Sequence, residues 1–360
     1  MRGQENKQQS FFSYVSAEER IPKKHPLRPI KTMVNKALED MSPLFSSVYS
    51  HMGRPSIPPE QLLRATIIQI LYSVRSERML LEQLEYNILF RWFVGLSMDD
   101  SVWNHSVFSK NRQRLLNTEV AAAFFVAIKE QAEQAELLSD EHFSVDGTLL
   151  EACASMKSFQ PKDDTTEPPA TGGRNPEVDF RGQERKNDTH RSTTDPDARL
   201  YRKSKTQEAK LCYMGHVLME NRNGLVVDGM VTKANGTAER EAAGAMLESI
   251  PGTKRATLGA DKAYDTKDFV KTLRSCKVTP HVAAKEKGSA IDQRTKRHAG
   301  YSISLKTRKR VEEIFGWLKT VGTMKKMKLT GHPKVECLFS FALSSYNLIR
   351  MKNLGVEAVT

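Results

Sequence analysis

Two apolar runs and the polar turn between them decide the fold of this chain, from Lys210-Leu-Cys-Tyr-Met-Gly-His-Val-Leu-Met219 through Glu220-Asn-Arg-Asn-Gly224 to Leu225-Val-Val-Asp-Gly-Met-Val231. An Asn-Gly step between two such runs is typical of a β-hairpin. Upstream, Phe143-Ser-Val-Asp-Gly147 predicts a short strand that ends in a glycine turn. We therefore expect three strands near the middle of the chain.

The sequence after the hairpin alternates between helical and strand patterns. The expected elements are a helix at Thr237–Ile250, a strand at Ala256–Ala260, a helix at Thr266–Leu273, a strand at Val278–Val282, and closing helices at Arg308–Val321 and Val335–Met351. Asp265, followed by Asp268, resembles the start of a capping box for the second of these helices. Strands followed by alternating helices and strands predict an α/β layer fold with a mixed sheet.

The first part of the chain has helical periodicity instead. Helices are expected at Lys31–Leu38, Glu60–Val74, Met79–Phe93 and Val120–Gln134. An all-α N-terminal domain is therefore predicted ahead of the α/β domain. The expected organisation is a basic arm and helix at 1–48, a helical domain at 49–138, the α/β domain at 139–352, and a tail at 353–360.

A polar insertion at about 157–205 separates the first strand from the hairpin. It contains almost no apolar side chains, so it is not expected to bury itself. We expect an unstructured loop at 160–175. The mixed polar and aromatic residues of Phe180–Tyr201 predict a loop that orders against a substrate.

Composition limits the class of protein. The 360 residues include 55 Lys and Arg against 43 Asp and Glu, a formal net charge of +12, which indicates a polyanionic partner. The longest apolar runs are too short to span a membrane, and the polar N-terminus does not resemble a signal peptide. The four cysteines are widely spaced, as expected for reduced thiols rather than a zinc finger. We expect a cytoplasmic protein with no membrane partner.

The positive charge is concentrated in one block. Between Lys285 and Lys334 there are 14 Lys and Arg against 4 Asp and Glu. A solvated helical face normally mixes both signs, so such a block favours contact with phosphates. The block lacks the interleaved aromatic residues of an RNA-binding platform, which favours double-stranded DNA.

Three carboxylates stand where a metal site could form. Asp146 and Asp261 each end a predicted strand, and ligands of α/β sheets bind in the crevice beyond such strand ends. Phosphodiester chemistry commonly uses two Mg²⁺ ions on hard oxygen ligands. Each aspartate alone is also compatible with an ordinary turn.

The helix at Arg308–Val321 supplies the third acid. At 100° per residue, Arg308, Glu312 and Lys319 project at about 60°, 100° and 80° from Val311, beside the apolar face. Glu313 projects at about 200°, toward solvent. The geometry therefore selects Glu312 as the inward acid.

At these residues the sequence resembles bacterial insertion-sequence transposases of the DDE class, in the group named after insertion sequence five. Arg308-x3-Glu312-x6-Lys319 matches their arginine, glutamate and lysine signature, although Leu305 stands at the place of the signature tyrosine. Ser144-Val-Asp-Gly-Thr148 and Gly259-Ala-Asp-Lys-Ala-Tyr-Asp265 match the two aspartate motifs, and Gly53-Arg-Pro-Ser-Ile-Pro-Pro-Glu60 resembles part of the N-terminal helical domain. The resemblance covers nearly the whole chain.

The resemblance implies an RNase H-like catalytic domain that cleaves and joins DNA at the terminal inverted repeats. Asp146, Asp261 and Glu312 would be the catalytic residues and would hold two Mg²⁺ ions, for which Mn²⁺ can substitute. The residues expected to contact DNA are Arg308, Lys319, Lys262, Lys306, Lys309, Arg310, Lys110, Arg112 and Arg114. Joining two element ends implies a homodimer, in a bacterial cytoplasm and at the nucleoid when bound to DNA. The alternatives are an RNase H-like nuclease and a transposase-derived DNA-binding protein without catalysis.

Two local alternatives stay open at this point. The helix that contains Phe108-Ser-Lys-Asn-Arg-Gln-Arg114 presents three cations at helical spacing, either to DNA as a recognition helix or to solvent as part of a packing or dimerising helix. Tyr264 either contacts DNA beside Asp261 or packs under its own loop.

Overall fold

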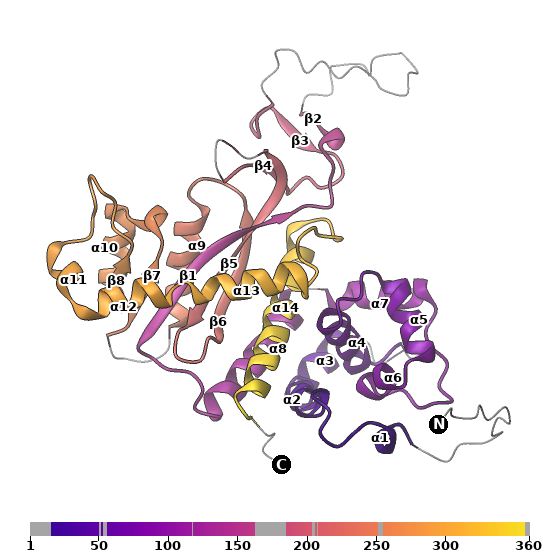
Figure 1. Ribbon diagram of the computed structural model, residues 1–360. Coiled ribbons are helices and arrows are strands. Elements are labelled where there is room, and N and C mark those ends of the chain that lie inside the picture. Colours follow the sequence, from indigo (N-terminus) through magenta and orange to yellow (C-terminus); the bar gives the residue numbers. More distant parts are fainter. Residues whose placement is uncertain are drawn as a thin grey trace, which may run out of the picture.

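The computed structural model describes residues 16–49, 52, 56–116, 118–162, 185–203, 206, 208–250 and 255–356. Its centre is a mixed sheet, and the N-terminal part of the chain is helical (Figure 1). The strands of this sheet are β1 (His142–Glu151), β4 (Arg199–Tyr201), β5 (Lys210–Glu220), β6 (Val226–Lys233), β7 (Thr257–Ala260) and β8 (Thr279–Val282). A separate ribbon consists of β2 (Phe159–Pro161) and β3 (His190–Ser192).

The strand order confirms the predicted fold. It runs β4-β5-β1-β7-β8, and β6 pairs with β5. β5 is antiparallel to β1 and β6, whereas β7 is parallel to β1 and β8 is parallel to β7. The antiparallel strands β1, β5 and β6 are therefore neighbours, and the parallel strands β7 and β8 lie on the other side of β1. This arrangement is an RNase H-like sheet, and helices flank it.

Helices cover both faces of this sheet. The helices after β6 are α9 (Ala238–Met246), α10 (Lys267–Ser275), α11 (Gln293–Arg297), α12 (Ala299–Thr307), α13 (Arg310–Thr320) and α14 (His332–Asn353). On one face, α9 and α10 share a buried core with Phe143 and Val145 of β1. On the other face, α13 and α14 share a core with Leu150 of the same strand. Alternate residues of β1 therefore serve opposite layers.

The course of β1 corrects one expectation. The strand does not end at Gly147 but continues to Glu151, and Gly147 lies opposite His216 of β5. Asp146 consequently lies in the middle of a strand instead of at its tip. Thr148 and Leu150 continue the burial of the strand, so pairing with β5 outweighs the turn tendency of the Asp-Gly step.

The apolar side of α13 is buried as its helical spacing predicts. Val311, Ile314 and Leu318 are buried against the sheet, which confirms that part of the helical projection. Val321 repeats at the same helical spacing, but it lies just beyond the last residue of α13 and is only half-buried.

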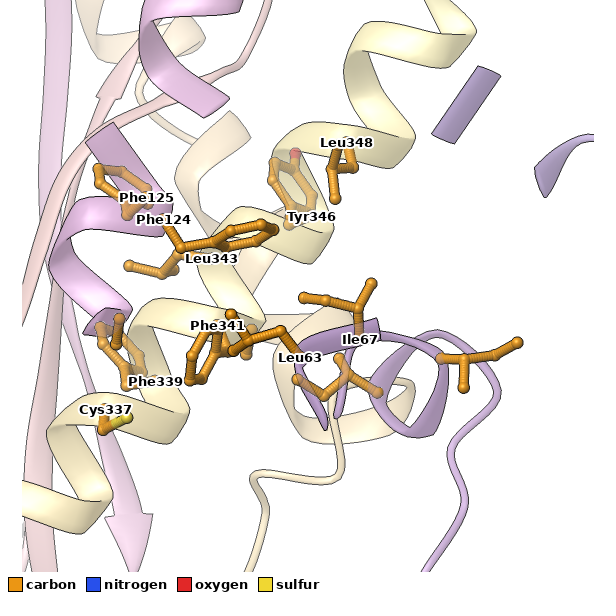
Figure 2. Packing of buried hydrophobic residues seen from close by; sticks show 14 of the residues in the cluster. Leu63, Ile67, Phe124, Phe125, Cys337, Phe339, Phe341, Leu343, Tyr346 and Leu348 are labelled. Atoms are coloured by element: carbon orange, nitrogen blue, oxygen red, sulfur yellow. The ribbon is translucent and has the colours of Figure 1, made fainter. Parts of the chain in front are cut away.

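The N-terminal helices pack against α14. They are α1 (Ala17–Arg20), α2 (Leu27–Asp40), α3 (Ser42–Val48), α4 (Pro59–Leu71), α5 (Glu77–Tyr86), α6 (Ile88–Val94), α7 (His105–Leu115) and α8 (Thr118–Gln134). Figure 2 shows Leu63 and Ile67 of α4 on the side that meets α14 near Phe341. The rings of Phe124 in α8 and Phe341 lie 5.9 Å apart. One apolar core therefore joins the helical part to the sheet.

Two helix boundaries differ from expectation. The helix expected at Met79–Phe93 is interrupted at Asn87, whose backbone is extended and whose Oδ1 accepts a hydrogen bond of 3.0 Å from the Leu89 N–H. Asp265 is not the cap of α10, because the Thr266 side chain caps that helix. The buried Asp265 carboxylate accepts hydrogen bonds from the N–H groups of Lys285 and Ala290 instead.

Part of the insertion is built into the fold, contrary to the expectation that it stays unburied. β4 pairs with the edge of β5, and Ser192 and Asp195 are fully buried. The Tyr213 hydroxyl donates a hydrogen bond to the Oδ1 of the buried Asp195 carboxylate. Residues 185–203 thus order against their own sheet. Most of the loop expected at 160–175, the start of Phe180–Tyr201 and the first 15 residues of the arm lie outside the described residues.

Candidate active site

Asp146 and Asp261 lie on neighbouring parallel strands. Asp261 follows the last residue of β7, as predicted, and its Oδ1 accepts a hydrogen bond of 2.6 Å from the Ala263 N–H. Asp146 is half-buried, and its Oδ1 accepts a hydrogen bond of 2.8 Å from the Gly147 N–H. β7 pairs with β1 only as far as Ser144, so the edge of β1 is open at Asp146.

The surroundings of Asp146 contain charges of both signs. Burial raises the pKa of Asp146, whereas the Gly147 hydrogen bond and the positive charge of Lys203 lower it. The negative charge of Asp261 raises it, and Arg308 lowers it. Charges act on one another in this way only over short distances, so these side chains form one electrostatic cluster.

Arg308 reaches the cluster from the junction of α12 and α13. Its Cβ lies 3.3 Å from the position that a Cβ on Gly259 of β7 would take, and the Ser144 Oγ lies equally close to that position. The glycine in β7 therefore leaves room for Arg308 above the two parallel strands.

Glu312 follows Arg308 by one helical turn, and both Glu312 and Glu313 are exposed. Lys319 lies two turns further on, where burial and the charge of Lys203 lower its pKa. Along the sequence Glu312 lies between Arg308 and Lys319, and its exposed side chain stays a predicted rather than an observed member of the cluster. Glu313 acts on a different group, because its charge contributes to the raised pKa of Tyr346 in α14.

A further carboxylate, Glu239 of α9, belongs to the same cluster and was not predicted. Burial raises the pKa of Glu239, Lys203 lowers it, and the charges of Asp146 and Asp261 raise it further. An acid in the first turn of a helix is commonplace, so the sequence carried no signal that separates Glu239 from Glu241.

Lys203 is the second group that sequence reasoning missed. It comes from the end of the insertion, and its Nζ donates a hydrogen bond of 2.8 Å to the Gly147 carbonyl oxygen. The same Nζ lies 3.7 Å from the Glu239 Oε1. A lysine in a polar segment without periodicity gives no indication of such a contact.

Tyr264 packs under its loop, which decides between the two alternatives for this residue. Its side chain is fully buried and stands 5.4 Å, centroid to centroid, from Phe269 of α10. Burial raises its pKa, as do the charges of Glu239, Asp146 and Asp261.

The cations expected to bind DNA differ in their surroundings. Lys306, in the last turn of α12, and Lys309, just before α13, are both exposed. The Lys262 Nζ lies 3.4 Å from the exposed carboxylate of Glu286. Arg310 donates hydrogen bonds of 2.6 and 3.2 Å to the carbonyl oxygens of Asn221 and Arg222, so its guanidinium holds α13 to the hairpin turn.

In the helical part, the three cations of α7 also separate into two kinds. Lys110 and Arg114 are exposed. Arg112 forms an ion pair of 2.5 Å with Glu77, and only 12% of the arginine side chain is exposed. Arg112 therefore serves packing between α5 and α7.

The donor set at Asp146, Asp261, Glu239 and Glu312 consists of hard carboxylate oxygens, which suit Mg²⁺ or Mn²⁺. Within the described part of the chain, no three acidic, histidine or cysteine side chains converge closely enough to hold an ion together as they stand. Two carboxylates and several waters are the usual complement of a protein-bound Mg²⁺. The residues present therefore fit such an ion. In the same described ranges, no helix is long and apolar enough to cross a lipid bilayer.

Comparison with known proteins gives two family matches. Residues 15–114 match a transposase domain (DUF772), and residues 138–348 match the transposase DDE domain. No curated protein matches the chain. Among solved structures, it is similar to a piggyBac transposase in a synaptic complex with hairpin DNA, at 9% identity over 93% of this chain and 77% of that chain, with a TM-score of 0.43.

A second solved structure is a pre-cleavage Mos1 transpososome, at 11% identity over 92% of this chain and 93% of that chain, with a TM-score of 0.21. The match to the transposase DDE domain spans more than half of the chain and contains Asp146, Asp261 and Glu312. The chain therefore belongs to the transposase DDE domain family and is a DNA transposase of the DDE class.

Proposed function

We propose that this transposase cleaves and joins DNA with Asp146, Asp261 and Glu312 as its catalytic carboxylates. The observation that supports this most is the meeting of Asp146, Asp261 and Arg308 at the open edge of β1, beyond the end of β7. Glu312 is included because the helical projection puts it on the same side as Arg308 and Lys319.

Divalent metal ions, Mg²⁺ or Mn²⁺, are the cofactors that these carboxylates would hold. When bound, such ions supply activation of the attacking oxygen and neutralisation of the charge that develops at phosphorus. Asp146 has a raised pKa next to Asp261, and ligation by a cation relieves repulsion between two such carboxylates.

Arg308 and Lys319 are proposed to bind the phosphates on either side of the scissile bond. Arg308 precedes α13 and Lys319 lies near its end, and neither forms an ion pair with a carboxylate among the residues that the structure describes. The exposed Lys306 and Lys309 extend this positive surface, and Lys262 lies beside Asp261. Since catalysis of phosphoryl transfer depends mainly on positioning and charge, these cations matter as much as the acids.

The helical region 49–138 is proposed to bind the terminal inverted repeats or to form the dimer. Lys110 and Arg114 of α7 are exposed and available for phosphates. Because two element ends must be joined, we propose that a homodimer holds them, in the cytoplasm and at the nucleoid of a bacterium.

The test uses the purified chain, a labelled duplex from the end of its genomic element, and Mg²⁺. Wild type is expected to cut at the element boundary and to join the freed 3′-hydroxyl to a target duplex, whereas Asp146→Asn should do neither. Asp268→Asn, in the exposed first turn of α10, is the matched control and should cut normally. Cutting without joining would support the nuclease alternative. Binding of the duplex without cutting, by wild type as well as by both variants, would support the DNA-binding alternative.

A further inference from the structure

Glu239 lies against the strand that carries Asp146. A Cβ placed on Gly147 would stand 3.1 Å from the Glu239 Cγ and 3.2 Å from its Oε1. Such distances are shorter than ordinary van der Waals contacts, so the glycine after Asp146 is what allows Glu239 to approach β1. Glu239 is mostly buried there, with 21% of its side chain exposed.

A histidine nitrogen without a partner points to the same place. The Nδ1 of His216 would lie 3.0 Å from a Cβ on Gly147, next to the Glu239 carboxylate. His216 is fully buried, and its Nε2 is 2.8 Å from the Thr232 Oγ1. Its Nδ1 has no hydrogen-bond partner among the described residues. A buried polar atom of this kind calls for a ligand or a ligand-bound water.

A second buried polar atom without a partner among the described residues belongs to Tyr264, in the loop after Asp261. The hydroxyl of Tyr264 is buried and, within the described residues, has no hydrogen-bond partner. The charges of Glu239, Asp146 and Asp261 all act on it. Two orphaned polar groups beside several carboxylates indicate a site that takes a hydrated ion.

A cationic group of the protein already stands at this site. The Lys203 Nζ contacts the Gly147 carbonyl oxygen at 2.8 Å and lies 3.7 Å from Glu239, and its charge acts on Asp146. Because 45% of the Lys203 side chain is exposed, the lysine can move outward without breaking a packed core.

We propose that Glu239 is a fourth carboxylate of the active centre, which binds a divalent cation together with Asp146, and that Lys203 takes the place of this cation on Glu239 when the metal is absent. The inference rests on the proposed function, since it adds a ligand to the same metal site. Two carboxylates with several waters are sufficient for Mg²⁺. The neutral His216 and the Tyr264 hydroxyl would then meet the waters of the ion.

Lys203 and the ion therefore compete for Glu239. Removing the lysine should strengthen metal binding, because the carboxylate loses a rival partner. Removing the Glu239 charge should weaken metal binding. Opposite effects of the two variants on metal affinity distinguish this arrangement from a purely structural ion pair. In a structural pair, removing either side chain would change stability and leave metal affinity unchanged.

The experiment is a titration of the full chain with Mn²⁺, followed by the electron paramagnetic resonance signal of the free ion, with and without a short duplex. Wild type is compared with Glu239→Gln, Lys203→Met and Asp146→Asn. Glu241→Gln is the matched control, an exposed acid two residues further along α9. Thermal unfolding without metal verifies that each variant is folded.

We expect Glu239→Gln to weaken Mn²⁺ binding at least about tenfold, since even groups that only support a metal ligand cost that much. Lys203→Met should strengthen binding about threefold or more, and Glu241→Gln should not change it. Wild-type affinity in Glu239→Gln, with binding lost in Asp146→Asn, would overturn the role of Glu239 and leave the proposed function intact. Equal weakening in both Glu239→Gln and Lys203→Met would overturn the competition. Absence of Mn²⁺ binding by wild type, with and without DNA, would contradict the metal-dependent function itself.

Discussion

The Tyr213 hydroxyl donates a hydrogen bond of 2.6 Å to the Asp195 Oδ1, and both side chains are fully buried. The Gly331 N–H, at the start of α14, donates to the same oxygen at 3.2 Å. Asp195 belongs to the polar insertion, Tyr213 to the central strand β5, and Gly331 to the loop before the last helix. This carboxylate therefore ties the insertion to the sheet and to the helix that joins both parts of the molecule.

Tyr213→Phe should destabilise the protein. The change removes one of two donors from a buried carboxylate, and hydrogen bonds to charged groups contribute about 1.5–3 kcal/mol. We expect the free energy of unfolding, measured with urea, to fall by about that amount. Tyr86→Phe is the control, because 79% of Tyr86 is exposed. Equal stabilities of the two variants would show that the Asp195 bond contributes nothing.

Glu312→Gln should abolish cleavage while leaving DNA binding largely intact. The helical projection puts Glu312 on the side of Arg308 and Lys319, whereas the charge of Glu313 acts on Tyr346 in α14. The loss of cleavage should be at least about a hundredfold, the size expected when one charge-stabilising group leaves an active site. Glu313→Gln, the adjacent control, should cut normally. If the two effects were exchanged in a cleavage assay, the orientation of α13 given above would be wrong.

The local signals in the sequence were sufficient for much of the fold. The hairpin at 210–231 and the strand before Asp261 have the predicted positions, because short apolar runs bounded by turn residues fix a strand locally. The apolar face of α13 was also accessible, since Val311, Ile314 and Leu318 repeat at helical spacing.

The contacts that depend on tertiary structure were not accessible in this way. β1 extends past Gly147 because its neighbour β5 supplies partners, whereas the Asp-Gly step by itself indicates a turn at this point. Glu239 and Glu241 are alike in sequence and differ only in how α9 packs on the sheet. Lys203 reaches the site from a segment whose composition predicted no structure. The proximity of Asp146 and Asp261 was therefore accessible from the sequence, and the groups that surround them were not.

Stability should decrease as the pH falls from about 6.5 toward 4, partly because of His281. Burial lowers the pKa of His281 to about 4, and the neighbouring His142 and His298 add to the shift. Between these two values the unfolded chain binds more protons than the folded chain, so the contribution of His281 is complete above pH 6.5 and is lost as the pH falls to 4. The slope should approach about 1.4 kcal/mol per pH unit for this group.

Carboxylates with raised pKa values, such as Asp146 and Glu239, act in the opposite direction, because their folded forms retain protons at higher pH. The contribution of His281 is therefore isolated by comparing urea unfolding of wild type and His281→Gln at pH 7, 6 and 5. The stability of the variant should depend less on pH. Parallel pH profiles would exclude His281 as a source of the acid sensitivity.

Arg112→Met should destabilise the helical part instead of weakening DNA binding directly. Only 12% of the Arg112 side chain and 15% of the Glu77 side chain are exposed, so the variant takes the arginine from a largely buried carboxylate and leaves it only the His105 Nε2, 3.8 Å away. Breaking a buried ion pair from one side costs about 3–5 kcal/mol, and the residual exposure places the expected loss near the lower value, about 3 kcal/mol. Thermal and urea unfolding measure the loss. Arg114→Met, from the exposed side of α7, should unfold like wild type.

Lys110→Ala should weaken DNA binding in a way that depends on salt. Lys110 is exposed on α7, so its contribution would come from displacing a counterion from a phosphate. Losing one such contact lowers the slope of the logarithm of the binding constant against the logarithm of salt concentration by about 1. Binding of an element-end duplex at several salt concentrations measures this slope. Because stability should be unchanged in Lys110→Ala, an unaltered slope would favour the interpretation of α7 as a packing or dimerising helix whose basic side faces solvent.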